Sequence, residues 1–302
     1  MADTVYLESL EDSEVLLSKL SQPVRDWFKD KFPDFTDPQK MAIPSIVDGE
    51  HLLLCSPTGS GKTLTAFLTI IDKLVRLAMD GNLEKQVYCV YISPIKALAN
   101  DIQRNLIGPL TEIKERFLPG RTQEIKVGLR TGDTPQSERQ KMLRNPPHIL
   151  ITTPESLGLA LASKRFRPLM NHLQWMIIDE MHSLVPTKRG THLALTMALL
   201  DTLIENPVQR LGISATMEPL GEVARFLVPV KAEDREIEEG TPIPKFDDEE
   251  SSVVHIAKVS GARELDLDII LPHPKFSEVP VKKLLDHNVD IIKVLKRGWT
   301  EK

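Results

Sequence analysis

Leu52-Leu53-Leu54-Cys55-Ser56-Pro57-Thr58-Gly59-Ser60-Gly61-Lys62-Thr63 is the stretch that decides the fold. Its apolar start predicts a buried strand, and its centre predicts a glycine-rich turn. The amphipathic run from Leu64 to Met79 predicts a helix after the turn. A strand, a glycine-rich turn and Gly-Lys-Thr opening a helix form the pattern of a phosphate-binding loop. Ser56 departs from the strict pattern, which begins with glycine. From the motif alone, an ordinary turn between a strand and a helix is the alternative.

The residue types of this loop suit a nucleotide polyphosphate. Glycines let the backbone approach the phosphates and turn its N–H groups inward, and the start of the helix adds the positive end of its dipole. We expect Lys62 to reach the β- and γ-phosphates and Thr63 to ligate Mg²⁺. The nucleotide-binding residues predicted here are Pro57, Thr58, Gly59, Ser60, Gly61, Lys62 and Thr63.

Length and composition indicate a folded protein of the cytoplasm. The 302 residues suffice for one large domain or two small ones, and 41% hydrophobic residues suffice for a packed core. No apolar run reaches membrane-spanning length, and the N-terminus lacks a basic and then apolar leader. Cys55 and Cys89 fall in apolar runs, so we expect reduced core thiols rather than a disulfide or a metal pair.

The charge of the chain is unevenly distributed. The net charge is −5, but residues 233–250 alone carry −7, which leaves +2 for the rest of the chain. An acidic loop on a nearly neutral body is compatible with a local basic groove, so nucleic-acid binding is not excluded.

Strand-like and helix-like runs alternate after the Lys62 helix. The expected strands are 87–92, 125–129, 148–151, 175–178 and 208–213, each followed by a helical pattern. This alternation predicts an α/β fold with a mainly parallel sheet, helices on both faces and ligands at the carboxyl ends of the strands.

We expect three parts along the chain. Residues 1–35 form a helical lead-in, and residues 36–230 form the nucleotide-binding domain. Residues 231–302 form an acidic loop, a hairpin of 253–259 with 265–271, and a helix from 281 to 295.

A second group of chemically active residues follows the apolar run that ends at Ile178. In Asp179-Glu180-Met181-His182, Asp179 is placed to hold Mg²⁺ through water, because a carboxylate there lies beside the phosphate loop. We expect Glu180 to orient and deprotonate the attacking water, and His182 to relay the nucleotide state to neighbouring loops. The alternative for a lone Asp-Glu pair is a solvated turn.

Three further polar residues gain meaning from their positions. Gln39, on a short helix capped by Thr36 or Asp37, can read adenine because its amide both donates and accepts. Ser214 and Thr216 end the strand that follows the acidic one, and their hydroxyls can bond to the Asp179 loop and couple the sites. Taken singly, a surface glutamine and turn-capping hydroxyls are the alternatives.

Together these motifs resemble superfamily 2 helicases of the DExH type, in particular the large helicase-related (Lhr) branch near the Ski-type helicases. The likeness covers about residues 20–228, with the Gln39 stretch as the Q motif and Ser56–Thr63 as motif I. The other matching motifs are Pro94–Asp101 (Ia), Thr131–Asp133 (Ib), Thr152–Leu157 (Ic), Asp179–His182 (II) and Ser214–Thr216 (III). The resemblance implies a RecA-like P-loop NTPase domain.

The resemblance also implies contacts with a nucleic-acid strand. They would come from Lys96, Gly132, Asp133, Thr153 and Pro154, and from the basic turn Lys188-Arg189. Small, hydroxylated and basic groups suit a phosphate backbone and carry little sequence information. For Lys188-Arg189 a solvated basic loop is an equal alternative. We expect Arg130, Arg139 and Lys141 to be surface charges, with a place along the same groove as the alternative.

The function implied is an ATP- and Mg²⁺-dependent motor that unwinds or moves along DNA or RNA. Such helicases need a second RecA-like domain with an arginine finger, and no Gln-x-x-Gly-Arg-x-Gly-Arg pattern follows Thr216. We therefore expect the first motor domain of a longer helicase, weakly active when isolated. A remodelling translocase that does not unwind, and a nucleotide-gated binding module, are the alternatives.

Overall fold

A computed structural model of the chain describes residues 4–94, 99–118, 120, 122–204, 206–215, 217–228 and 253–259. Within them, eight strands form one sheet in the order β1-β8-β2-β7-β6-β3-β5-β4, and every pairing is parallel. The expected parallel sheet is therefore confirmed. The strands are β1 (Thr4–Tyr6), β2 (His51–Cys55), β3 (Cys89–Ile92), β4 (Val127–Arg130), β5 (Ile149–Thr152), β6 (Trp175–Ile178), β7 (Gln209–Ser214) and β8 (Val254–Lys258).

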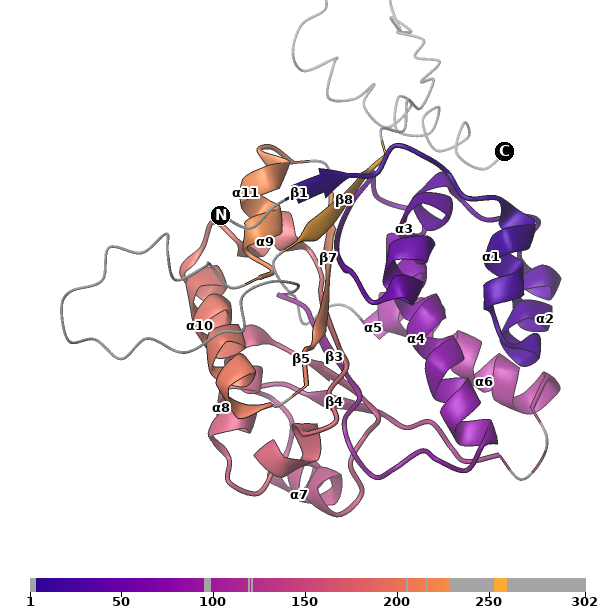
Figure 1. The fold of residues 1–302 in the computed structure, drawn as a ribbon. Helices are drawn as coiled ribbons and strands as arrows, with labels where there is room; N and C mark the ends of the chain where they lie inside the picture. The colour runs from indigo at the N-terminus through magenta and orange to yellow at the C-terminus, as the bar shows by residue number, and fades with distance from the viewer. Residues whose placement is uncertain are drawn as a thin grey trace, which may run out of the picture. The chain divides into compact units, whose positions relative to one another are not determined.

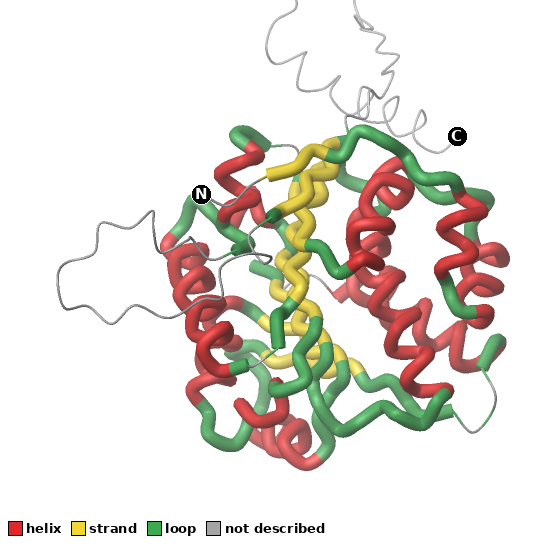
Figure 2. The backbone as a smooth tube through the Cα atoms, viewed as in Figure 1, coloured by secondary structure: helices red, strands yellow, loops and turns green. Residues whose placement is uncertain are grey.

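Helices cover both faces of the sheet, as the strand–helix alternation predicts (Figures 1 and 2). One face carries α1 (Ser13–Lys19), α2 (Gln22–Lys31), α3 (Asp37–Asp48), α4 (Lys62–Met79), α5 (Ala99–Ile102), a π-helical turn (Gln103–Ile107) and α6 (Gly108–Arg116). The other face carries α7 (Gln136–Arg144), α8 (Pro154–Ala162), a 3₁₀ turn (Arg167–Met170), α9 (Met181–Leu184), α10 (Lys188–Leu203) and α11 (Leu220–Arg225). No helix in the described part of the chain is both long and apolar enough to span a bilayer.

The continuous apolar runs of the central strands fill two cores at once. Cys89 and Tyr91 of β3 face the core under α1–α6, and Val90 and Ile92 face the core under α8–α11. Successive strand residues point to opposite faces, so a strand covered on both sides is apolar throughout. Cys55 and Cys89 are free thiols buried in these cores, as predicted.

Two segments that the sequence placed outside the nucleotide-binding domain form strands of its sheet. Thr4–Tyr6, in the expected helical lead-in, forms β1, and Val254–Lys258, beyond the expected boundary at 230, forms β8. β8 pairs in parallel with β1 on one side and with β2 on the other. Alternating hydrophobicity identifies a strand but does not name its partner. The expected acidic loop, the second hairpin strand and the final helix lie outside the described residues.

The lead-in helices are tied to the helix that follows the phosphate loop. Ser21, at the start of α2, donates from its backbone N–H (2.6 Å) and its hydroxyl (2.5 Å) to the buried carboxylate of Asp72 on α4. Trp27 and Phe28 of α2 are buried in the same core, so their aromatic rings help to pack α2 against that face.

Candidate nucleotide-binding site

A cavity of about 650 Å³ opens at the carboxyl ends of the strands. Because the strands run in parallel, the loops after β2, β6 and β3 meet along one edge of the sheet, where α/β folds bind ligands. The cavity is lined by the phosphate loop together with residues of α2, α3, α6 and the acidic strand end. From the predicted set it includes Gln39, Thr58, Gly59, Ser60, Gly61, Lys62, Thr63, Asp179 and Glu180.

The phosphate loop has the backbone geometry that its glycines suggest. Gly59 (φ 78°) and Gly61 (φ 89°) both lie in the left-handed region, which residues with a side chain rarely adopt. A Cβ on Gly61 would lie 3.4 Å from the Gln39 side-chain nitrogen, so the loop and the Gln39 helix are closely packed. Ser56, the departure from the motif, contacts Ser60 across the loop through their hydroxyl oxygens at 2.5 Å.

Lys62 is held by its own loop. Its Nζ donates to the carbonyl oxygens of Ser56 (2.6 Å) and Pro57 (2.7 Å). Burial lowers the pKa of the Lys62 amine, and the nearby carboxylates of Glu180 and Asp179 offset only part of this shift. The ammonium group therefore lies beside the cavity, between the loop carbonyls and the acidic strand end.

Both oxygens of the Asp179 carboxylate accept hydrogen bonds. The Tyr91 hydroxyl donates to Oδ2, and the Glu180 backbone N–H donates to Oδ1 at 2.8 Å. Burial raises the pKa of Asp179, and the two hydrogen bonds lower it. Glu180 has φ 53°, and it is the only non-glycine residue in the described ranges with a positive φ. A non-glycine residue held at positive φ is a feature of many functional sites.

His182 connects the acidic loop to the end of β7. Its Nδ1 lies 3.3 Å from Glu180 Oε2 and 3.3 Å from Ser214 Oγ. The His182 backbone N–H donates to the same Ser214 oxygen at 3.2 Å. The hydrogen bonding expected between Ser214 and the Asp179 loop is therefore present, whereas Thr216 lies outside the described residues.

Gln39 is a buried member of a capping box and not a surface residue. Its Oε1 accepts the backbone N–H of Thr36 at 2.9 Å, and Thr36 caps α3, as one of the two expected caps. The Thr36 hydroxyl donates to the Ser60 carbonyl at 3.1 Å, which joins this helix to the phosphate loop. The amide nitrogen of Gln39 faces Gly61 at the cavity wall.

The cavity has a second wall that no sequence motif indicated. This wall consists of Trp27, Lys31 and Phe32 at the end of α2, and Arg104, Asn105, Gly108 and Glu112 on the π-helical turn and α6. Glu112 joins the two elements, because it accepts from Trp27 Nε1 at 2.8 Å and pairs with Lys31 Nζ at 2.9 Å. Phe32, seven residues before Gln39 and partly exposed, was the one local signal. The approach of α6 is a tertiary contact that no local pattern encodes.

The residues assigned to a nucleic-acid strand follow β4 and β5 at the same sheet edge. Gly132 and Asp133 are exposed in the turn after β4. Thr153 caps α8 by accepting the Ser156 backbone N–H at 3.4 Å, and Pro154 is the first residue of that helix. Thr153 and Pro154 are buried, so a strand would reach the start of α8 chiefly through its backbone. Lys96 lies outside the described residues.

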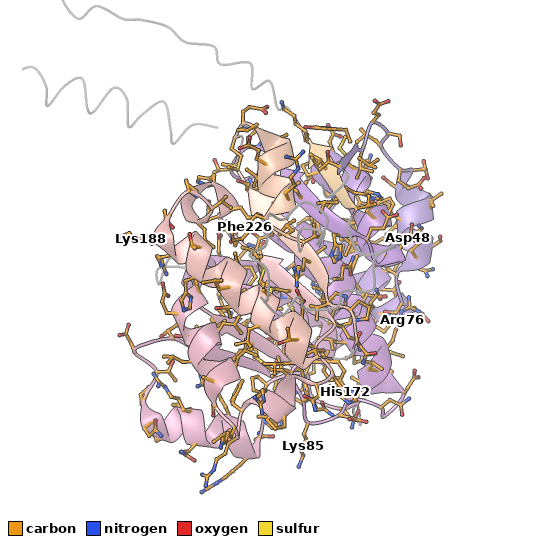
Figure 3. All side chains as sticks on the ribbon, turned by 60° about the vertical axis from the view of Figure 1, so that its left-hand side comes forward. Asp48, Arg76, Lys85, His172, Lys188 and Phe226 are labelled. Carbon is orange, nitrogen blue, oxygen red and sulfur yellow. The ribbon has the colours of Figure 1, made fainter. Side chains whose placement is uncertain are left out.

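Lys188 and Arg189 open α10 and differ in their surroundings. Lys188 is exposed, and Figure 3 shows it far from Lys85 and His172, which precede strands at the opposite end of the sheet. Arg189 donates from Nε to Glu155 Oε1 at 2.6 Å and from Nη1 to the Pro94 carbonyl at 2.8 Å. The hydrogen bond from Arg189 lowers the pKa of Glu155 to about 2.

Arg130 corrects the expectation of surface charge, whereas Arg139 is partly exposed. Arg130 is buried with its guanidinium 4.4 Å from the centre of the Phe166 ring, and burial lowers its pKa. Arg139 donates to the carbonyls of Thr131 (3.1 Å) and Gly132 (3.0 Å), so it shapes the turn after β4. Lys141 is exposed, as expected.

Comparison with known proteins gives one family throughout. The DEAD/DEAH box helicase family model matches residues 36–223. The chain is 51% identical over 218 residues to the ATP-dependent helicase Lhr-Core of Sulfolobus acidocaldarius, covering 71% of this chain and 24% of the relative. It is 41% identical over 297 residues to Lhr-Core of Methanocaldococcus jannaschii, covering 98% and 33%.

Among solved structures, the chain is similar to the Mycobacterium smegmatis helicase Lhr bound to ssDNA and AMP-PNP. The TM-score is 0.71 at 36% identity, and the match covers 92% of this chain and 33% of that one. The chain thus spans between a quarter and a third of the length of these relatives.

Proposed function

This chain belongs to the DEAD/DEAH box helicase family, and we propose that it is the ATP-binding motor domain of an ATP-dependent DNA or RNA helicase. The observation that carries the proposal is the meeting of Lys62 with Asp179 and Glu180 at one cavity. A cation for the phosphates, a carboxylate for a metal ion and a carboxylate for water are the groups that nucleotide hydrolysis requires.

The phosphate loop would bind the triphosphate. The backbone N–H groups of Gly59–Lys62 and the start of α4 would attract the negative oxygens. Lys62 would exchange its bonds to the Ser56 and Pro57 carbonyls for bonds to the β- and γ-phosphates. Gln39 would accept and donate at the adenine edge, with Phe32 and Arg104 along the second wall beside the nucleoside.

Thr63 and Asp179 are the proposed Mg²⁺ residues, and their chemistry suits that ion. Mg²⁺ prefers oxygen ligands and keeps several waters, so one hydroxyl and one carboxylate acting through water make a suitable set. The two oxygens of Asp179 each accept one hydrogen bond and so each keep a lone pair. When bound, Mg²⁺ would neutralise charge that develops on the β- and γ-phosphates.

Glu180 is the proposed general base. It would accept a proton from the water that attacks the γ-phosphate, while Lys62 and the loop N–H groups stabilise the negative oxygens. His182 and Ser214 would transmit a change at Glu180 to β7, because His182 contacts Glu180 and Ser214, at the end of β7, contacts His182.

We further propose that a single strand of DNA or RNA crosses the edge formed by the loops after β3, β4 and β5 and the start of α10. Lys96, Gly132, Asp133, Thr153, Pro154, Lys188 and Arg189 are the proposed contacts. A second RecA-like domain would supply an arginine finger, which is worth on the order of 10³–10⁵ in rate. The isolated chain is therefore expected to bind ATP and hydrolyse it slowly.

Titration of the chain with a fluorescent ATP analogue and Mg²⁺ tests the proposal. Lys62→Ala should weaken binding roughly 10- to 100-fold, because it removes charged hydrogen bonds to phosphate. Lys85→Ala, at an exposed position at the opposite end of the sheet, is the control. Equal binding by wild type and Lys62→Ala would contradict the nucleotide site. Rapid turnover stimulated by nucleic acid in the isolated chain would contradict the need for a second domain.

A further inference from the structure

We propose that Tyr91 is a positioning residue for the Mg²⁺ site, where it holds the Asp179 carboxylate in a fixed relation to the helix that carries Thr63. This inference rests on the proposed function, since it concerns how the metal residues are kept in place. It adds a residue that touches neither nucleotide nor metal.

Tyr91 lies between the two elements that would share the ion. Its side chain is completely buried, and its hydroxyl donates to Asp179 Oδ2. Its ring stacks on Phe67 of α4, with 5.1 Å between ring centres and 29° between ring planes. Phe67 follows Thr63 by four residues, so the two side chains lie on the same face of α4, one turn apart.

The backbone of Asp179 is fixed by its neighbours, so only the carboxylate is free to change its orientation. The Asp179 backbone N–H donates to the Ile92 carbonyl at 2.9 Å, so the end of β6 is already tied to β3. The carboxylate can still rotate about its side-chain bonds, and the Tyr91 and Glu180 donors hold its two oxygens. Groups that orient metal ligands in this way typically contribute 10- to 100-fold to metal affinity or activity.

Tyr88 shows that a buried tyrosine of this strand region need not bond to Asp179. It is also buried, three residues earlier in the chain, and its hydroxyl accepts the Glu84 backbone N–H at 3.0 Å. Neither tyrosine lines the cavity, but only Tyr91 bonds to a carboxylate that does. Tyr88→Phe therefore removes a comparable buried hydroxyl without touching Asp179, which makes it a matched control for Tyr91→Phe.

The test measures metal binding without turnover. Mn²⁺, which takes the oxygen ligands that suit Mg²⁺, is titrated into the chain with AMP-PNP, and free Mn²⁺ is followed by electron paramagnetic resonance. Tyr91→Phe should weaken Mn²⁺ binding about tenfold or more and leave metal-free AMP-PNP binding unchanged. Tyr88→Phe should leave both unchanged. Urea unfolding of each variant verifies that the metal assay reports on folded protein.

A double variant separates positioning from general damage. In an Asp179→Asn background, Tyr91→Phe should cause no further loss of Mn²⁺ affinity, because the group it orients has gone. Wild-type Mn²⁺ affinity in Tyr91→Phe, an equal loss in Tyr88→Phe, or an additive loss in the double variant would overturn the proposal. Failure of the wild-type chain to bind AMP-PNP with Mn²⁺ would instead overturn the proposed function itself.

Discussion

Ser214 Oγ accepts the backbone N–H of His182 at 3.2 Å and lies 3.3 Å from the Nδ1 atom of the same residue. A single buried hydroxyl thus contacts both the main chain and the ring of the residue that follows the acidic pair. The His182 ring also lies 3.3 Å from the Glu180 carboxylate. Movement of Glu180 towards a nucleotide would therefore change the contact between His182 and Ser214 at the end of β7.

Ser214→Ala should lower the free energy of unfolding by about 1–3 kcal/mol, because the His182 N–H would lose its acceptor. Urea denaturation measures the loss. Ser183→Ala, next to His182 on α9 but exposed and donating to the Glu180 carbonyl, should cost clearly less. Equal losses would mean that the Ser214 contact contributes no more than an exposed one.

Gly61→Ala should weaken ATP binding, and Gly81→Ala should not. Both glycines have positive φ, so alanine costs about 1–2 kcal/mol of backbone strain at either position. At Gly61 the added Cβ would make only ordinary contacts with Gln39 (3.4 Å) and Thr36 (3.5 Å), so the effect is backbone strain in the loop that lines the cavity; Gly81 does not line it. Unfolding titrations should show similar losses for both variants, and nucleotide titrations should show weaker binding for Gly61→Ala alone.

Lys188→Gln and Arg189→Gln should respond differently to salt. If exposed Lys188 neutralises one phosphate of a single strand, its loss reduces the salt dependence of binding by about 0.7 in the log–log slope. Arg189 donates hydrogen bonds to Glu155 and the Pro94 carbonyl, so Arg189→Gln disturbs the local structure. The weaker strand binding of this variant should therefore persist at high salt. Binding to labelled single strands over a salt series checks this. An unchanged slope for Lys188→Gln would favour the solvated loop.

The stability of the fold should fall on acidification through His148. Its Nδ1 accepts the Lys126 backbone N–H at 2.9 Å. Burial first, and then the charge of Lys126, lower the pKa of His148 from 6.5 to about 4. Neutral His148 contributes fully to the free energy of unfolding when the pH is above its pKa in the unfolded state. This contribution is lost as the pH falls from that value to the pKa of His148 in the folded state. The loss is on the order of 3 kcal/mol.

His148→Asn keeps an acceptor near the position of Nδ1 and does not titrate. Between about pH 7 and pH 5, urea unfolding should therefore show a smaller loss of stability for this variant than for wild type. His172→Asn, at an exposed position, is the control and should follow wild type. Parallel curves for wild type and His148→Asn would show that His148 does not carry the pH dependence.

The parts of the fold that the sequence predicted best are those with a local signal. The phosphate loop is identified by a motif of consecutive residues. The central strands are identified by continuous apolar runs, because both faces of the sheet are covered. The gathering of the site then follows from parallel strands alone, since their carboxyl ends share one edge. Lys62, Asp179 and Glu180 meet at the cavity for that reason.

What the sequence did not predict depends on contacts between distant segments. Glu112 joins the cavity because α6 packs against α2, and nothing near Glu112 indicates this. Arg130 was expected on the surface, but the Phe166 ring 36 residues later offers its guanidinium a buried face. A single charged or apolar residue has no period from which its partner can be inferred.

The position of β8 sets the order in which the sheet can be completed. β8 lies between β1 and β2 and hydrogen-bonds to both, whereas β1 pairs within the described residues only with β8. As the chain leaves the ribosome, Thr4–Tyr6 has no sheet position to occupy until Val254–Lys258 has emerged and docked on β2. The strands that carry the cavity can assemble before then. Among the strands of the described residues, β1 comes first in the sequence and is the last to be joined to the sheet.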